Sequence, residues 1–185
     1  NSITGISYFP ETVSLAELGQ VDLAIKSPGF KPTHPILIAL KSQNVPIISE
    51  IGLAREFFKG KIIGITGTDG KSTTTALTYH IIKNSFPKTK MGGNIGVPFI
   101  EFCLEDLDFA VLELSSYQLE DSDFLSLNIS SILNIATDHL ERHGTMDKYL
   151  EAKKRIINLE NKDSVFVTNK RLIDKLNLEA LNFKG

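Results

Sequence analysis

The sequence has little cysteine, no tryptophan and no long hydrophobic run. A single cysteine, Cys103, excludes an internal disulfide framework and favours a reducing compartment, so we expect a cytoplasmic protein. The longest apolar runs, such as residues 35–40, are too short to span a bilayer. A net charge of −2 offers no excess of positive charge for nucleic acid or a membrane surface. These absences favour a globular protein whose main partner is neither nucleic acid nor membrane.

Apolar strand patterns and helical patterns alternate along the chain, which predicts an α/β fold: a mostly parallel sheet with helices on both faces. Strands are predicted at residues 23–25, 46–49, 61–66, 109–114, 129–135 and 164–168, and helices at 35–43, 50–59, 72–84 and 146–159. We place a boundary near Ser49, with a partial α/β unit in residues 1–49 and a nucleotide-binding domain in residues 50–185. Because the sequence begins at Asn1 without an initiator Met, we expect a piece of a longer protein.

The stretch from Gly64 to Thr75 has the pattern of a strand that leads into a phosphate-binding loop (P-loop) and then into a helix. We expect Gly67 and Gly70 to take positive φ values and to let the backbone approach a ligand. The amide groups of such a loop, with the positive end of the helix, form a site for polyphosphate. Lys71 can reach the β- and γ-phosphates, and Ser72 can ligate Mg²⁺. The stretch therefore predicts binding of ATP or GTP.

The loop departs from the usual pattern at Ile65, where another glycine is expected, and keeps the shorter form Gly-x-x-Gly-Lys-Ser-Thr. The alternative is a glycine-rich turn with a surface lysine. The order of strand, loop, Lys-Ser and helix favours the nucleotide site.

Acidic and histidine side chains stand near the ends of two later strands. Glu113 is a carboxylate in an otherwise apolar strand, where burial is costly unless the charge is paired or binds a cation. We favour a Mg²⁺ role over a carboxylate at the sheet rim, because parallel sheets bind ligands at these strand ends. Asp138 and His139 follow another strand, and His139 could be structural or a metal ligand. We expect His143 to face solvent, because Gly144 disfavours a continuous helix there.

Lys153 lies within the apolar face of a predicted helix, four residues after Tyr149 and four before Ile157. Its aliphatic stem could lie over apolar surface with the ammonium in water. Alternatively, the side chain is directed into a site.

Five ordered segments of the sequence resemble the Mur ligase family. They are residues 67–73, 93–96, 113–120, 134–144 and 149–153, and Ser27-Pro28-Gly29 is similar to part of the family's N-terminal domain. The resemblance covers nearly the whole chain. Glu-Leu-Ser-Ser-Tyr-Gln-Leu-Glu together with Gly-Lys-Ser-Thr is most similar to the branch that adds D-glutamate to UDP-N-acetylmuramoyl-L-alanine.

The resemblance implies a role for each matching residue. The nucleotide site would comprise Gly67, Thr68, Asp69, Gly70, Lys71, Ser72 and Thr73. The magnesium ligands would be Ser72, Glu113, His139 and a carbamylated Lys153, and the substrate contacts Asn94, Ser115 and Gln118. Lys71, His139 and Lys153 would be the catalytic residues, with Lys153 converted by CO₂ into an anion that supports a second Mg²⁺. Asp69 stands where the family often has Asn, and Tyr117 where it often has Phe.

The resemblance further implies an ATP-dependent, ADP-forming acid–amino-acid ligase of peptidoglycan synthesis, which works through an acyl phosphate and serves cell wall biogenesis, cell shape and cell division. We expect a monomer with ATP and Mg²⁺ as cofactors. The family has three domains, so residues 1–49 would be a partial UDP-substrate domain and residues 50–185 an incomplete ATP-binding domain. The C-terminal domain would be absent, and we expect the chain alone to be inactive. The alternatives are another Mur ligase, a folylpolyglutamate synthase-like ligase, or a nucleotide-binding regulatory module.

Overall fold

The computed structural model describes residues 14–122, 125–138, 140–157 and 163–176. Its main element is a five-stranded sheet in which every neighbouring pair is parallel, in the order β4-β5-β3-β6-β7. The strands are β3 (Lys61–Thr66), β4 (Thr89–Gly93), β5 (Phe109–Glu113), β6 (Ile129–Ile132) and β7 (Val165–Thr168). The α/β fold predicted from the sequence is therefore confirmed.

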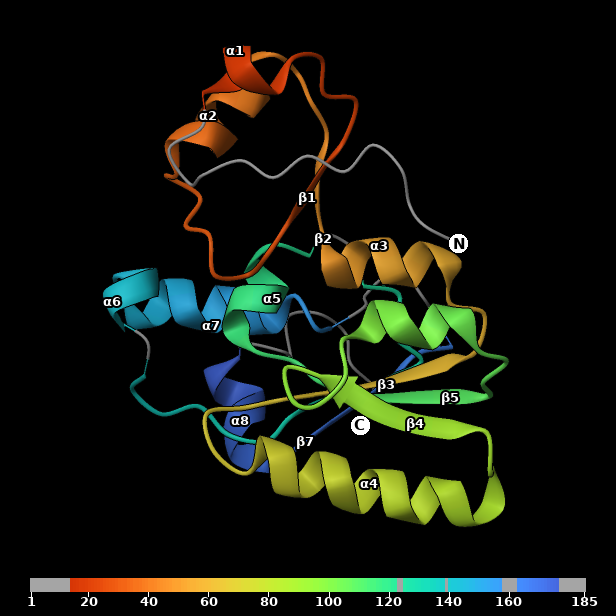
Figure 1. Ribbon diagram of the computed structural model, residues 1–185. Helices are drawn as coiled ribbons and strands as arrows, with labels where there is room; N and C mark the ends of the chain where they lie inside the picture. Colours follow the sequence, from red (N-terminus) through yellow and green to blue (C-terminus); the bar gives the residue numbers. More distant parts are fainter. Residues whose placement is uncertain (1–13, 123–124, 139, 158–162, 177–185) are drawn as a thin grey trace.

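Helices cover both faces of this sheet (Figure 1). Helix α4 (Lys71–Ser85) lies on one face, where Tyr79 and Ile82 pack against Ile63 and Ile65 of β3. The opposite face is covered by α3 (Glu50–Phe57), the 3-10 helix η1 (Phe99–Leu104), α5 (Ser116–Glu120), α7 (Met146–Lys154) and α8 (Lys170–Lys175). Strand β3 is buried from its second residue onward because helices cover both of its faces, which explains its continuous apolar sequence.

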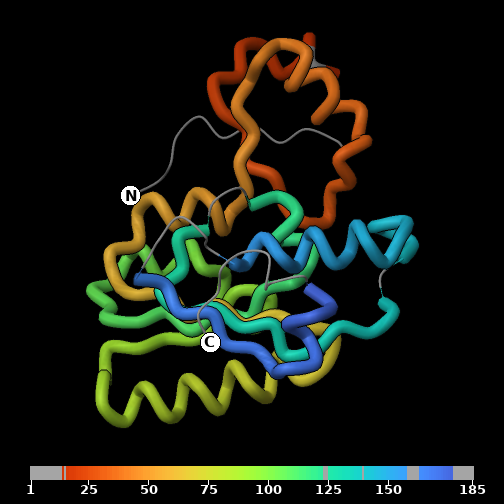
Figure 2. Tube along the Cα trace, turned by 180° about the vertical axis from the view of Figure 1, so that it is seen from behind, coloured from red at the N-terminus to blue at the C-terminus, as the bar shows by residue number. Residues whose placement is uncertain are grey.

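A smaller unit precedes the sheet and lies beyond its α5 and α7 side (Figure 2). It comprises α1 (Leu15–Leu18), β1 (Ala24–Lys26), α2 (Pro35–Ser42) and β2 (Ile47–Ser49), with β1 parallel to β2. We call it the β1–β2 unit. Strand β2 runs directly into α3, because the Ser49 hydroxyl accepts a hydrogen bond from Gly52 N at 3.0 Å and caps the helix.

Most predicted elements are present, with altered ends. The strand predicted at 129–135 ends at Ile132, and the helix predicted at 146–159 spans Met146–Lys154. Six further elements were not predicted from the sequence: strand β4 and the short helices α1, η1, α5, α6 (Leu140–His143) and α8. Within the described ranges, each helix is too short or too polar to cross a lipid bilayer.

Candidate nucleotide and metal site

The loop of residues 67–70 joins β3 to α4 at the carboxyl edge of the sheet. Gly70 has a φ of 76°, in the left-handed region that disfavours other residues, and it forms the N-cap of α4. At Gly67 a Cβ atom would lie 3.1 Å from the Cβ of Leu133, so the loop packs closely against the end of β6. The first amide groups of α4 have no acceptor within the helix and can bind an anion. The loop thus has the shape of a phosphate site.

Asn134, just beyond β6, fastens this loop. Its side-chain oxygen accepts hydrogen bonds from the amides of Thr68 at 3.0 Å and Asp69 at 2.8 Å, and its Nδ2 donates to the Asp69 carbonyl at 2.9 Å. No role was predicted for Asn134 from the sequence. The available signal was its position directly after a strand that ends at the same edge as the loop.

Glu113, the last residue of β5, receives two hydrogen bonds. Ser72 Oγ donates to its Oε2 at 2.7 Å, and Asn94 Nδ2 donates to its Oε1 at 2.8 Å. The carboxylate is 2% exposed, and neither donor carries a charge that would balance it. Two predicted magnesium ligands, Ser72 and Glu113, and one predicted substrate contact, Asn94, therefore meet at one point.

The donor set at Glu113 fits Mg²⁺, which prefers oxygen ligands and is commonly bound by one or two carboxylates together with waters and substrate phosphates. In the part of the chain that the structure describes, no group of three or more His, Cys, Asp or Glu side chains is arranged to hold a metal ion by itself. His139, which the sequence analysis proposed as a further ligand, lies outside the described residues.

Lys71 and Lys153 approach the loop from opposite sides. Lys71 Nζ donates to the Thr68 carbonyl at 2.8 Å. Lys153 Nζ, on α7, donates to the Gly67 carbonyl at 2.9 Å and to the Thr66 hydroxyl at 3.2 Å. Lys153 is 1% exposed, so its amine lies beneath the loop and not in water.

The surroundings of Lys153 favour its neutral form. Burial, followed by the charge of Lys71, lowers its pKa to about 7, although Asp138 acts in the opposite direction. The amine lies over the Tyr149 ring, 4.8 Å from its centroid, a contact that by itself favours the charged form. A neutral amine has a free electron pair, so Lys153 can act as a nucleophile near neutral pH.

The expectation that His143 faces solvent is wrong. The side chain is 5% exposed, and its Nε2 lies 3.0 Å from Ser116 Oγ. Its ring lies 5.6 Å from that of Tyr117 and 5.4 Å from that of Tyr149, between centroids. Gly144, with a φ of 77°, turns the chain between α6 and α7 and so lets His143 fold inward.

Two predicted substrate contacts have structural partners in α5. Ser115 and Gln118 form a capping box: Gln118 Oε1 accepts from the Ser115 amide at 3.0 Å, and Ser115 Oγ accepts from the Gln118 amide at 3.2 Å. The box begins two residues after Glu113, so it lies at the same edge of the sheet as the phosphate loop. Asn94, the third predicted contact, bonds Glu113 as described above.

Comparison with known proteins identifies the family of this chain. Residues 65–182 match the model of the Mur ligase middle domain. The UDP-N-acetylmuramoylalanine–D-glutamate ligase of Leptospira interrogans is 53% identical over 181 residues, which are 98% of this chain and 39% of that relative. The ligase of the same name from Aquifex aeolicus is 42% identical over 153 residues, 82% of this chain and 37% of the relative. The chain thus spans about two fifths of these curated relatives.

Solved structures share the fold. The Neisseria ligase described as UDP-N-acetylmuramate:L-alanyl-gamma-D-glutamyl-meso-diaminopimelate ligase superposes with a TM-score of 0.58 at 17% identity, over 84% of this chain and 55% of that chain. MurF ligase from Thermotoga maritima gives 0.53 at 21% identity, over 85% and 44%. Because the family model covers more than half of the sequence, this chain belongs to the Mur ligase family and contains its middle domain.

Proposed function

We propose that the full-length protein is an ATP-dependent ligase that joins D-glutamate to UDP-N-acetylmuramoyl-L-alanine in peptidoglycan synthesis. The observation that carries the proposal is the 53% identity, over 98% of this chain, with a relative named for this reaction. The meeting of Ser72, Glu113 and Lys71 around a phosphate loop supports the part of the reaction that uses ATP. On this proposal the protein serves cell wall growth, and through it cell shape and division.

The proposed reaction has two steps. In the first, a carboxylate oxygen of UDP-N-acetylmuramoyl-L-alanine bonds to the γ-phosphorus of ATP, the bond from that phosphorus to the β–γ bridging oxygen breaks, and ADP leaves, which gives an acyl phosphate. The amine of D-glutamate then attacks the acyl carbon, an amide bond forms, and the bond between the acyl carbon and the bridging oxygen breaks to release phosphate. Bound Mg²⁺ would supply positive charge to the phosphate oxygens.

The residues of this chain would position the phosphates and balance their charge. The amides of residues 67–73 would surround them, and Lys71 would exchange the Thr68 carbonyl for a phosphate oxygen. Ser72 and Glu113 would ligate the metal, with His139 as a further ligand. Asn94, Ser115 and Gln118 would contact the sugar nucleotide.

Lys153 is proposed to be carbamylated. The neutral amine would attack the carbon of CO₂ and form an N–C bond while one C–O π pair moves onto oxygen. Loss of a proton from the nitrogen to solvent would then leave a carbamate anion in place of the amine. The lowered pKa supports the first step, because only the unprotonated amine has an electron pair to donate. The product would place a negative charge beneath the phosphate loop, where it would support a second Mg²⁺.

The domain arrangement is likewise a proposal. Residues 1–49 would form part of the UDP-substrate domain, and residues 50–185 would form most of the ATP-binding domain, with the amino-acid domain outside this chain. We further propose that the protein is a monomer in the cytoplasm, which sedimentation and cell fractionation would test.

Phosphate release by the full-length protein tests the proposed function. With ATP and Mg²⁺, release should require both UDP-N-acetylmuramoyl-L-alanine and D-glutamate. If phosphate release instead requires a different amino acid or a different acyl acceptor, the protein is another ligase of the family. Phosphate release that depends on neither substrate would instead favour a nucleotide-binding regulatory module.

A further inference from the structure

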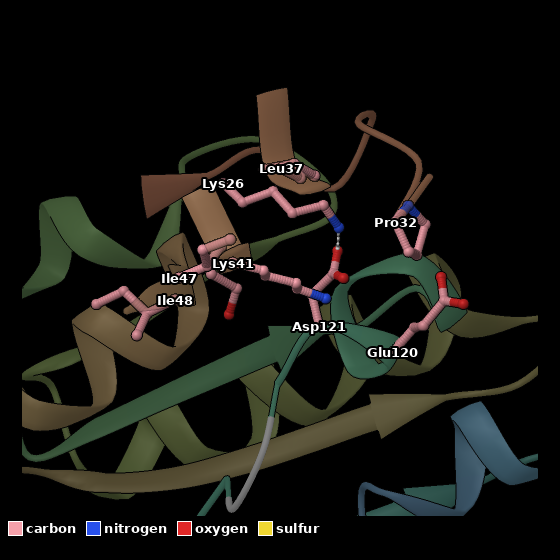
Figure 3. A pocket seen from close by; sticks show the side chains of 9 residues that line it. Lys26, Pro32, Leu37, Lys41, Ile47, Ile48, Glu120 and Asp121 are labelled. Carbon is pink, nitrogen blue, oxygen red and sulfur yellow. Dashed lines mark hydrogen bonds and ion pairs between the residues drawn. The ribbon is translucent and has the colours of Figure 1, made fainter. Parts of the chain in front are cut away.

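Lys26 and Asp121 form a buried ion pair between the β1–β2 unit and the larger sheet domain (Figure 3). The two side chains are 5% and 12% exposed. Lys26 is the last residue of β1, and Asp121 is the C-cap of α5. The pair therefore joins two segments that lie 95 residues apart in the sequence.

Further contacts join the same two parts of the molecule. Ser49 Oγ at the end of β2 lies 3.1 Å from Ser122 Oγ, and both side chains are buried. Arg142 donates from Nη2 to the Phe30 carbonyl at 3.1 Å and from Nε to Glu120 at 3.1 Å. These contacts from the β1–β2 unit thus end on residues 120–122 or on Arg142, which is itself bonded to Glu120.

Each residue of the ion pair lies next to a segment with a predicted role in the site. Lys26 directly precedes Ser27-Pro28-Gly29, and Asp121 ends the short helix that starts two residues after Glu113. A displacement of Asp121 relative to Lys26 would therefore change the distance between that loop and the phosphate site. A substrate that contacts both would then fit less well.

A buried ion pair of this kind is sensitive to the loss of one partner. Removal of either charge leaves the other buried without its partner, whereas removal of both leaves no unpaired charge. The pair lies beside a cavity of about 210 Å³, which is also lined by Lys41 and Glu120.

We propose that the Lys26–Asp121 ion pair is an interdomain clamp that holds the loop 27–29 at a fixed position relative to the phosphate loop, and so positions a substrate that spans the two. The effect on substrate binding rests on the proposed function, because it assumes that the sugar nucleotide contacts both the loop 27–29 and the site beside the phosphate loop. The clamp itself does not rest on it.

Two measurements on the full-length protein test the clamp. Without ligand, Lys26→Met and Asp121→Asn should each speed amide hydrogen exchange in residues 24–30 and 47–49 by about tenfold or more, and leave residues 61–66 unchanged. With substrates, each should raise KM for UDP-N-acetylmuramoyl-L-alanine by about tenfold, while kcat and KM for ATP stay within about threefold. The exchanged pair Lys26→Asp with Asp121→Lys should recover part of both effects.

The exposed pair Lys88–Asp106 supplies the matched control, because it joins the same residue types with side chains 57% and 91% exposed. Lys88→Met with Asp106→Asn should change neither measurement. Unchanged exchange and KM in both single variants would overturn the clamp. Faster exchange throughout the sheet domain would also overturn it, since that shows general destabilisation. If the wild type shows no turnover with the sugar nucleotide, the proposed function fails. Hydrogen exchange alone then tests whether the ion pair acts as a clamp.

Discussion

Lys71 and Lys153 donate to consecutive carbonyl oxygens of the phosphate loop: Lys71 to Thr68 at 2.8 Å and Lys153 to Gly67 at 2.9 Å. Two amines are thus held on adjacent peptide units, and the charge of Lys71 contributes to the lowered pKa of Lys153. Lys71 suits the binding of phosphate charge, and Lys153 suits nucleophilic chemistry.

Replacement of Lys71 tests the phosphate site. Lys71→Ala should lower turnover by about a hundredfold or more, because the loop would lose the amine that is proposed to contact the transferred phosphoryl group. Lys83→Ala is the control, since Lys83 is an exposed lysine on the same helix. Steady-state kinetics of the full-length protein give the answer. Near-normal turnover in Lys71→Ala would contradict the assignment.

Replacement of Lys153 tests its proposed carbamylation. Lys153→Ala should be inactive, and short carboxylates such as acetate or formate should restore part of the activity by supplying the missing anion. Lys154→Ala should retain activity, because Lys154 is the next residue and pairs with Glu151 on the helix surface. Full activity in Lys153→Ala would show that this lysine contributes to packing and not to catalysis.

The pKa of Lys153 predicts a dependence of stability on pH in CO₂-free buffer. Above pH 7 the folded protein holds this amine neutral, whereas the unfolded chain keeps it protonated up to about pH 10.5. The unfolded state therefore binds more protons, and the free energy of unfolding rises with pH between about 7 and 10.5, by up to about 5 kcal/mol. Relative to Lys153→Met, the wild type should gain stability over that window in denaturant titrations. Parallel curves for the two proteins would refute the lowered pKa.

Asn134 is predicted to stabilise the phosphate loop. Asn134→Ala removes three hydrogen bonds to Thr68 and Asp69, so the protein should lose about 1–3 kcal/mol of stability and bind ATP more weakly. Asn84→Ala, at an exposed position near the end of α4, should have little effect on either quantity. Calorimetric titration with ATP and thermal unfolding supply the two readouts. An unchanged affinity for ATP would show that Asn134 does not contribute to nucleotide binding.

The sequence predicted elements whose pattern is local. Strand β3 was correct at both ends, because helices cover both faces and the apolar run has the length of the strand. Strand β4 was missed because Thr-Lys-Met-Gly-Gly has no apolar pattern. It is a strand through its pairing with β5, and at Gly92 a Cβ would lie 2.2 Å from the Val97 carbonyl oxygen. Helix α5 carried a readable signal in its Ser-x-x-Gln capping box.

Site residues that act through distant partners were not predictable in the same way. Glu113 and Lys153 stood out because a charged residue interrupted an apolar pattern. Asn134 and Asp121 interrupt no such pattern, and their partners lie 65 or more residues away. Burial of His143 likewise depends on the turn at Gly144, which directs the ring between two tyrosines.

The most direct test of the central claim follows an oxygen atom. The full-length protein is incubated with ATP, Mg²⁺, D-glutamate and UDP-N-acetylmuramoyl-L-alanine that carries ¹⁸O in its free carboxylate. The ¹⁸O content of the released phosphate is then measured by mass spectrometry. Ligation through an acyl phosphate transfers one labelled oxygen to each phosphate. Phosphate that carries no label would show that water received the phosphoryl group, and would contradict the ligase.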